Sequence, residues 1–147
     1  MGGRVQAPSL LYTVKQLELV VRARLDDMLR GSGVTTPQYT ALTVLAHRDG
    51  ISAAQLARDS FVTPQSMAEM LRLLERRGLV RRSPNPASRR ELRVHLTDEG
   101  RALMASYDDA LAALERELTE GLTAAEVAAF RRTVATLWDS ARGGDIP

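Results

Sequence analysis

The chain has 147 residues, of which 44% are hydrophobic, and it contains no cysteine and two histidines. This length is enough for one buried core, while the composition excludes disulfides, thiolate metal sites, cysteine nucleophiles and thiol-based redox sensing. No apolar run approaches the roughly 20 residues needed to cross a membrane, and the first eight residues lack an apolar signal segment. We therefore expect a cytoplasmic protein with no membrane partner, metal or other cofactor.

Charge is distributed unevenly along the chain, although the formal net charge is only +2. Residues 72–93 contain eight arginines and two glutamates, a local net charge of +6. Residues 94–147 contain five arginines and ten acidic residues, a local net charge of −5. A segment this basic is typical of a surface that binds phosphates, so the charge pattern favours nucleic acid as the partner.

Two helices are predicted first along the chain. Apolar residues recur at helical spacing through residues 10–28, and the glycines in residues 31–33 end that helix. Thr36 and Pro37 supply an N-cap and a first-turn proline for a second helix, which ends at residues 49–50.

Two shorter helices with clear start signals follow. Ser52 and Gln55 form a capping-box pattern that opens a helix closing near Ser60. A Thr-Pro pair at residues 63–64 starts the next helix, which runs to residues 77–78. A short helix, a tight connection and a second helix are typical of a helix-turn-helix unit, whose second helix enters the major groove of DNA.

A two-stranded hairpin is predicted next. Residues 79–83 and 91–96 can both form strands, and two prolines within residues 84–90 prevent a helix between them. In the second strand every other residue is apolar, which predicts one buried face made of Leu92, Val94 and Leu96. A hairpin directly after a helix-turn-helix is the wing of a winged helix-turn-helix.

Two longer helices complete the prediction. Thr97 caps a helix whose apolar residues run from Leu103 to Leu118, and Thr123 with Glu126 forms a capping box for the last helix. The expected fold class is therefore mainly α with a small β-hairpin wing.

The helix over residues 63–77 separates its side chains into two faces. One face is apolar and carries Met67, Met70, Leu71 and Leu74, and the opposite face carries Gln65, Glu69, Arg72 and Arg76. Glutamine can pair with adenine, arginine with guanine, and glutamate can accept from the cytosine amino group. An ordinary solvated helix is the alternative, but the basic hairpin that follows favours DNA reading. The residues predicted to bind DNA are Thr63, Pro64, Gln65, Ser66, Glu69 and Arg72.

The hairpin turn carries adjacent arginines, and more arginines flank it at Arg81, Arg82 and Arg93. Isolated surface arginines commonly serve solubility alone. Adjacent arginines at the end of a projecting ribbon instead favour phosphate contacts and insertion into a narrow minor groove. The wing residues predicted to bind DNA are therefore Ser88, Arg89 and Arg90.

Three stretches resemble the MarR (multiple antibiotic resistance regulator) family, at residues 74–82, 85–90 and 96–100. The wing pattern of that family is Asp-x-Arg followed by Leu-Thr-x-x-Gly, and Arg90 with the Leu-Thr-x-x-Gly of residues 96–100 fits the spacing. Ser88 stands where the family usually has an aspartate that braces the wing arginine, and Asn85 stands where an acid often precedes Pro86. The resemblance implies a transcriptional regulator, for which repression is the commoner outcome.

The resemblance also implies a homodimer in which the first helix and the last two helices of each subunit interlock. Apolar faces in both terminal regions support this, because one small lobe cannot cover them, although some of these residues can instead belong to the core of one chain. The interface candidates are Leu10, Leu11, Val14, Leu17, Leu111, Leu114, Phe130, Val134, Leu137 and Trp138. We expect a winged helix-turn-helix lobe over residues 34–97 and a discontinuous dimerisation region of residues 1–33 and 98–147.

Relatives often release DNA when a small anionic or phenolic compound binds in the crevice between the dimerisation helices and the DNA-binding lobe. By resemblance, the residues that could line such a crevice are Tyr12, Tyr39 and His47. A packing role is the commoner interpretation for a tyrosine or histidine on a helix. The expected partners are double-stranded DNA, a second copy of the chain and a small anionic or phenolic effector.

A winged helix used as a protein-interaction module is the alternative from a different class. Such a surface should present aromatic anchors, and residues 63–77 contain none. An enzyme is not expected, because the sequence shows no nucleophile-and-base pair, no phosphate-cradling glycine loop and no metal-ligand spacing. The sequence therefore predicts a sequence-specific DNA-binding regulator that binds a pseudo-palindromic site and has no catalytic residues.

Overall fold

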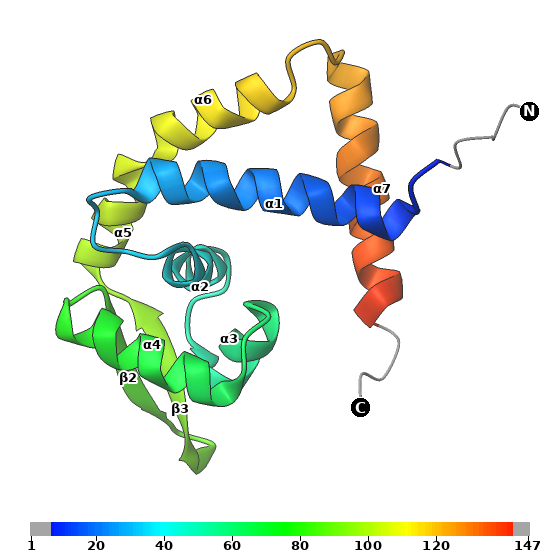
Figure 1. Ribbon diagram of the computed structural model, residues 1–147. Coiled ribbons are helices and arrows are strands. Elements are labelled where there is room, and N and C mark those ends of the chain that lie inside the picture. Colours follow the sequence, from blue (N-terminus) through cyan, green and yellow to red (C-terminus); the bar gives the residue numbers. More distant parts are fainter. Residues whose placement is uncertain (1–6, 143–147) are drawn as a thin grey trace, which may run out of the picture. The chain divides into compact units, whose positions relative to one another are not determined.

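The computed structural model describes residues 7–142, and the side chains of Arg89 and Arg142 lie outside the described part. Its elements are α1 (Leu10–Leu29), α2 (Thr36–His47), β1 (Ile51–Ser52), α3 (Ala53–Asp59), α4 (Pro64–Arg76), β2 (Val80–Asn85), β3 (Ser88–Leu96), α5 (Asp98–Ser106), α6 (Asp108–Leu118) and α7 (Ala124–Arg142) (Figure 1). The chain divides into two compact units, Met1–Ala110 and Leu111–Pro147. The first unit holds the strands, α1 to α5 and the start of α6.

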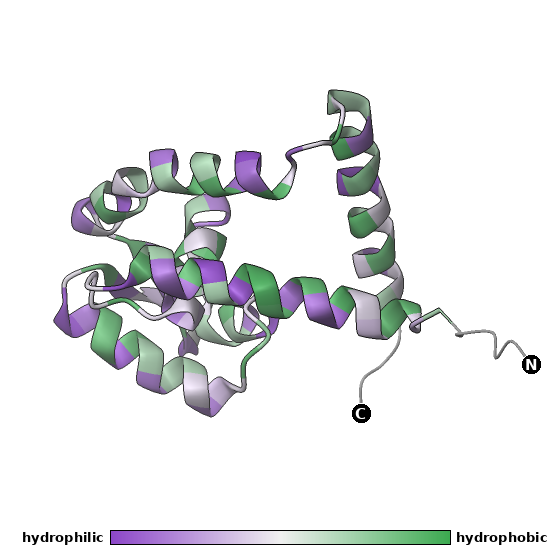
Figure 2. Ribbon diagram, turned by 45° about the horizontal axis from the view of Figure 1, so that its top comes forward, coloured by the Kyte–Doolittle hydropathy of each residue, from purple (hydrophilic) through white to green (hydrophobic). Residues whose placement is uncertain are grey.

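A small antiparallel sheet forms one layer of the first unit, with strand order β1-β3-β2. Val94 of the central strand pairs with Ile51 of β1 and with Arg82 of β2. Helices α2, α3 and α4 pack on the sheet and on one another, each turning its apolar side inward (Figure 2). The largest fully buried side chains are Leu42, Leu45, Leu56, Met67, Leu71, Leu74, Val80 and Val94. The predicted class, mainly α with a β-hairpin wing, is confirmed.

Helix starts follow the predicted caps with one displacement. Thr63 and Thr97 cap α4 and α5 as expected, each accepting from the backbone N–H three residues later. The N-cap of α2 is Thr35 and not Thr36, because Gln38 can return a hydrogen bond to the Thr35 N–H and so complete a capping box. Ser52 caps α3 by accepting from the Gln55 N–H. The side chain of Gln55, however, donates to Asp59 and does not return a hydrogen bond to Ser52 as a capping box would require.

The sheet differs from the prediction at both ends. β1 was missed, because two residues are too short to show a strand pattern. The wing strands extend almost to the turn, so the hairpin projects as a narrow ribbon below α4 (Figure 1). Leu92 was predicted to be buried but is 42% exposed. Leu92 follows the predicted alternation, but it lies beyond the end of the core in which Val94 and Leu96 are buried.

The predicted helix that begins after Thr97 is broken into α5 and α6 at Tyr107. The Tyr107 N–H donates to Met104 O, three residues back, as in a tightened last turn. The Tyr107 ring packs edge-on against the buried ring of Tyr39, with centroids 6.2 Å apart. Apolar spacing continues through the break, so the hydrophobic pattern could not reveal it.

The second unit contains the remainder of α6 and α7. The predicted capping box before α7 is confirmed, since Glu126 accepts from the Thr123 N–H and Thr123 accepts from the Glu126 N–H. Apolar side chains on α7 remain exposed in this single chain, namely Phe130, Val134, Leu137 and Trp138. Within residues 7–142, none of the helices has the length and apolar character required to cross a bilayer.

Gly100, in the Leu-Thr-x-x-Gly stretch, lies where α5 meets the start of the wing. A Cβ at this position would stand 2.2 Å from the carbonyl oxygen of Leu79, which already accepts from the Thr97 N–H. The Leu79 carbonyl belongs to the backbone and cannot swing away, and the Leu96 side chain would also be contacted, at 2.9 Å. Only glycine therefore allows α5 to approach the strand this closely.

We predict that Gly100→Ala lowers the free energy of unfolding by about 1 to 3 kcal/mol, the usual cost of forcing extra volume into a packed site. Urea unfolding followed by circular dichroism measures this change. Ala102→Ser, an exposed position on the same helix, is the control and should cost only a few tenths of a kcal/mol. Equal stability of Gly100→Ala and the parent would contradict the close approach.

Candidate nucleic-acid interface

Helix α4 packs one face against the core and exposes the other face to solvent. Met67, Leu71 and Leu74 are fully buried, and Met70 at the edge of this stripe is half-buried. The opposite face carries Gln65, Glu69, Arg72 and Arg76, all of them exposed. The predicted division of α4 into a core face and a free polar face is therefore present.

The start of α4 is tightly organised by its cap. Thr63 Oγ1 accepts from the Ser66 N–H at 3.1 Å and donates to Ser66 Oγ at 3.0 Å. Pro64 occupies the first helical turn, where its missing N–H costs nothing. Gln65 thus lies exposed beside a rigid helix N-terminus, a favourable place for base or phosphate contacts. Leu73, which sequence reasoning did not single out, is 46% exposed on the same helix.

The adjacent arginines Arg89 and Arg90 lie on β3 and not in the turn of the wing. Arg90 lies in the stretch of β3 next to the turn, between Leu92, which pairs with Pro84, and Ser88, which pairs with Asn85, and the register is irregular there. Arg90 is exposed, and among the described side chains it forms no ion pair. Ser88 is half-buried and pairs with Asn85 across the ribbon, while Arg89 has its side chain outside the described part.

Asn85 braces the turn of the wing. Its Oδ1 accepts from the Ala87 N–H at 3.0 Å, and its Nδ2 donates to Glu91 Oε2 at 2.6 Å. Sequence reasoning missed this role, although asparagine before a proline is a recognised turn signal. The hydrogen bonds fix the ribbon end without the aspartate that the family usually has at position 88.

Arg82 ties the wing to α4. Its Nε and Nη2 both donate to Glu75 Oε2, at 3.0 and 2.6 Å. Its charge is therefore compensated within the protein, unlike that of Arg90. Sequence reasoning counted Arg82 among the flanking cations and did not identify Glu75 as its partner.

A second polar cluster fixes the base of the wing to the end of α2. His95 Nδ1 lies 3.1 Å from Asp49 Oδ2 and its Nε2 lies 2.9 Å from Ser83 Oγ. Burial alone would raise the pKa of Asp49, but hydrogen bonds from the Leu96 N–H and His95, with the charges of His95 and Arg101, hold it below its ordinary value. His95 is thus part of a brace and does not extend freely toward a phosphate.

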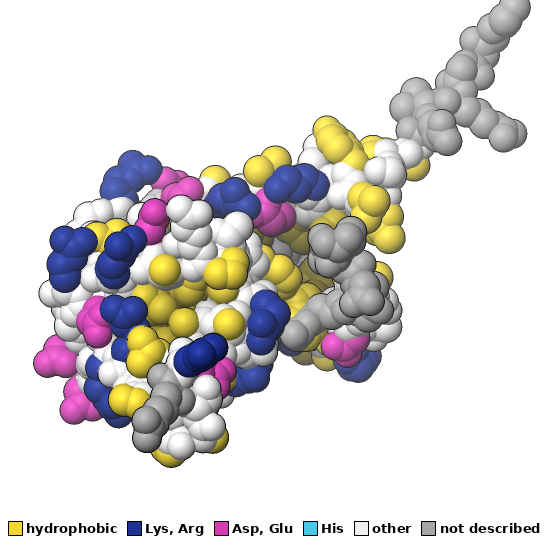
Figure 3. Space-filling view, turned by 90° about the horizontal axis from the view of Figure 1, so that it is seen from below, with side chains coloured by type: hydrophobic (Ala, Val, Ile, Leu, Met, Phe, Trp, Pro, Cys, Tyr) yellow, Lys and Arg dark blue, Asp and Glu magenta, His cyan; other side chains and the backbone are white. Residues whose placement is uncertain are grey.

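Arginine side chains surround the underside of the first unit, where the wing and α4 are exposed (Figure 3). A rigid helix with a free polar face, beside a ribbon that carries an exposed arginine, is the arrangement of a winged helix-turn-helix DNA-binding lobe.

Comparison with known proteins extends this assignment from class to family. A sequence model of the MarR family matches residues 34–92. The chain is 35% identical to the HTH-type transcriptional repressor Rv2887 of Mycobacterium tuberculosis over 137 residues, covering 93% of this chain and 98% of the relative. The chain belongs to the MarR family.

Solved structures agree with this result. The structure of Rv2887 in complex with salicylic acid has a TM-score of 0.71 and 33% identity, covering 90% of this chain and 98% of that one. The transcriptional repressor CouR bound to a 23-mer DNA duplex has a TM-score of 0.78 and 29% identity, covering 88% and 92%. The protein is therefore a DNA-binding transcriptional regulator and not an enzyme. Among the described residues, no group of histidine, aspartate and glutamate side chains could hold a metal ion.

The candidate effector residues lie apart from one another. Tyr39 is buried against Tyr107, and burial, with the nearby Asp108 and Tyr107, raises its pKa. Tyr12 is exposed near the start of α1, and exposed His47 at the end of α2 bonds to Thr43 O through Nδ1. The structure therefore does not bring the three side chains to one site.

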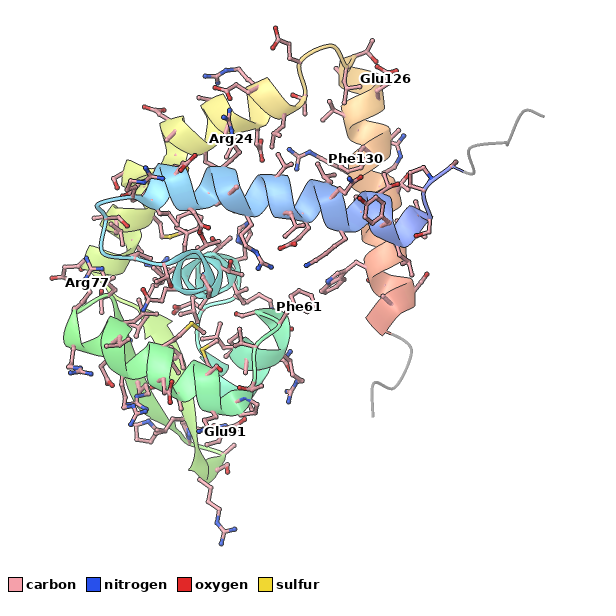
Figure 4. All side chains as sticks on the ribbon, in the orientation of Figure 1. Arg24, Phe61, Arg77, Glu91, Glu126 and Phe130 are labelled. Atoms are coloured by element: carbon pink, nitrogen blue, oxygen red, sulfur yellow. The ribbon has the colours of Figure 1, made fainter. Side chains whose placement is uncertain are left out.

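A hollow of about 690 Å³ lies instead between α1, the start of α2 and the connection from α3 to α4. Its lining residues are Glu18, Val21, Arg22, Leu25, Asp26, Thr36, Pro37, Thr40, Ser60, Phe61 and Val62. Ser60 is buried, and its Oγ has no hydrogen-bond partner among the described residues. Phe61 has a left-handed backbone with φ 57° and a largely exposed ring (Figure 4).

We predict different salt responses for two wing arginines. Arg90→Ala should weaken binding to duplexes of any sequence and lower the slope of log affinity against log salt by about 0.9, the value for one lost phosphate contact. Arg82→Ala removes the same charge, but that charge is paired with Glu75, so the slope should change much less. Fluorescence anisotropy at several salt concentrations measures both slopes. Equal slope changes would contradict the assignment of Arg90 to phosphate and Arg82 to the protein.

Proposed function

We propose that the protein is a homodimeric repressor that binds a pseudo-palindromic operator and releases it when a small aromatic acid binds. The observation that carries this proposal is the exposed polar face of α4 together with the exposed Arg90 of the wing that follows it. In the proposed contact, Thr63, Pro64, Gln65, Ser66, Glu69 and Arg72 enter the major groove, and Ser88, Arg89 and Arg90 follow the adjacent backbone and minor groove.

The dimer is proposed from apolar faces that one chain leaves in water. Leu10, Leu11, Val14 and Leu17 are exposed on α1, and Phe130, Val134, Leu137 and Trp138 are exposed on α7. Leu111 and Leu114 on α6 are half-buried. A helix face that leaves several large apolar side chains in water in this way marks an interaction site. In this proposal residues 34–97 form the DNA-binding lobe, and residues 1–33 and 98–147 form the dimerisation region.

The hollow beside α1 is the proposed effector site, in place of Tyr12, Tyr39 and His47. Val21, Leu25 and Pro37 supply apolar walls for a ring, and Arg22, which pairs with Glu18 of the same hollow, supplies a cation that a ligand carboxylate would have to share with Glu18. The hydroxyl of Ser60 is buried at the wall of this hollow and has no hydrogen-bond partner among the described residues. The volume of the hollow lies in the range of about 300 to 1,000 Å³ that is typical of small-molecule sites. The relative Rv2887 has been solved with salicylic acid.

Selection of bound duplexes from a random pool tests the DNA-binding proposal. We expect two related half-sites in opposite orientation, with centres about 34 Å apart, one turn of DNA. Gln65→Ala should change the preferred bases at a cost of about 1 to 3 kcal/mol for the original site, whereas Gln16→Ala on α1 should leave the preference intact. Unchanged selection by Gln65→Ala, or a folded monomer in light scattering at micromolar concentration, would contradict the proposal.

Titration with salicylate tests the effector site. We expect salicylate to release the selected duplex, and Arg22→Gln to weaken salicylate binding by about 10- to 150-fold, because a hydrogen bond to a charged group contributes about 1.5 to 3 kcal/mol. Arg30→Gln is the matched control, since Arg30 is exposed and pairs with Asp27 away from the hollow. Calorimetry gives both affinities, and an equal loss in the two variants would remove the hollow as the site.

A further inference from the structure

Arg77 connects the end of α4 to the segment that directly follows α1. Its Nη1 donates to the carbonyl oxygen of Gly33 at 2.6 Å, and its Nη2 donates to that of Ser32 at 3.1 Å. The residues lie 44 and 45 positions apart in the sequence, so the contact joins two distant parts of the first unit (Figure 4).

The two acceptor carbonyl groups, of Ser32 and Gly33, are held in place by contacts of their own segment. Leu29 and Val34, at either end of the connection, are buried in the core. Ser32 Oγ accepts from the Val34 N–H at 2.9 Å, and the Ser32 N–H donates to Leu29 O at 2.9 Å. The two carbonyl groups therefore stand at defined positions just beyond the C-terminal end of α1, where the helix dipole also favours a cation.

The donor side is fixed equally well. The Arg77 N–H donates to Leu73 O, and the Leu79 N–H donates to Leu74 O, which closes α4. Leu74 and Leu79 are buried. The guanidinium thus links two rigid points, the end of α4 and the end of α1.

We infer that Arg77 is a positioning residue that sets the angle of the DNA-reading helix relative to α1. The inference rests on the proposed dimer, in which α1 joins the two copies and any tilt of α4 changes the separation of the two reading helices. The 13 residues of α4 span about 18 Å at 1.5 Å per residue. A tilt of about 10° at the Arg77 end therefore moves the Gln65 end by about 3 Å.

The glycines of the connection supply a matched pair of variants. A Cβ on Gly33 would stand 3.0 Å from Arg77 Nη1, whereas a Cβ on Gly31 would meet nothing within 4 Å. Both glycines have positive φ, 74° and 81°, so alanine introduces similar backbone strain at either position. Only Gly33→Ala also displaces the guanidinium.

The experiment measures the distance between the two copies of α4 directly. The chain has no cysteine, so Ala68→Cys, at an exposed position on α4, gives one spin label per chain for dipolar electron paramagnetic resonance. In this background we compare the parent with Arg77→Met, Gly33→Ala and Gly31→Ala. If Gly33→Ala does not fold, Arg77→Met still tests the inference.

We expect the parent and Gly31→Ala to give the same narrow distance distribution. Arg77→Met should broaden it or shift it by about 3 Å per copy, as the length of α4 implies, and Gly33→Ala, which only crowds the guanidinium, should change it in the same way by less. On DNA, and in unlabelled chains that keep Ala68, Arg77→Met and Gly33→Ala should lose the preference for one half-site spacing, while a single half-site binds as before. The same distribution in all four proteins would overturn the inference. No dipolar signal in the parent would instead disprove the dimer, and with it the role of Arg77.

Discussion

Burial of one face of α4 is the constraint on which the rest of the structure depends. Met67, Leu71 and Leu74 enter the same core as Leu42, Leu56 and Val94. With a helical period of 3.6, fixing these three side chains also fixes which residues face outward. Full burial of an apolar side chain contributes about 1.5 to 3 kcal/mol. The packing of the lobe therefore determines the direction in which Gln65 and Arg72 point.

Polar contacts then fix the position of the wing relative to α4. Glu75 holds Arg82, Asn85 holds Glu91, and Asp49 holds His95, so the wing is tied to α4, to its own turn and to the end of α2. Exposed ion pairs contribute only about 0 to 1 kcal/mol to stability. These contacts matter more for geometry, because a ribbon and a helix must reach neighbouring grooves at the same time. The arginines of this surface consequently include Arg82, which positions the wing, and Arg90, which is exposed and is proposed to contact phosphate.

Local sequence signals predicted most of the elements that carry the site. Thr63, Thr97 and Thr123 each act as a cap at the expected place, because a cap depends on residues three or four apart. The Met67 to Leu74 stripe was equally readable, since its period is set by the helix alone. The same local information failed at Tyr107, where a contact with Tyr39 accompanies the break.

Contacts between distant residues could not be read from the chain. Nothing near Arg82 in the sequence distinguishes it from Arg81, and the difference is a glutamate seven residues earlier on another element. Likewise Leu92 follows the alternation of a buried strand but lies beyond the end of the core. Hydrophobic spacing reports which side of an element faces inward, whereas the extent of the core along that element is a tertiary property.

The two apolar faces outside the lobe connect stability with assembly in the proposed dimer. α1 contributes its last turns to the lobe through buried Leu29, while its first turns expose Leu10, Leu11 and Val14. One helix thus belongs to a core at one end and to the proposed subunit contact at the other. Because a straight helix transmits displacement along its length, a change at the subunit contact reaches the segment that Arg77 holds. In the proposed dimer, the subunit contact and the placement of α4 are therefore coupled through α1, and the proposed effector beside α1 would act on both.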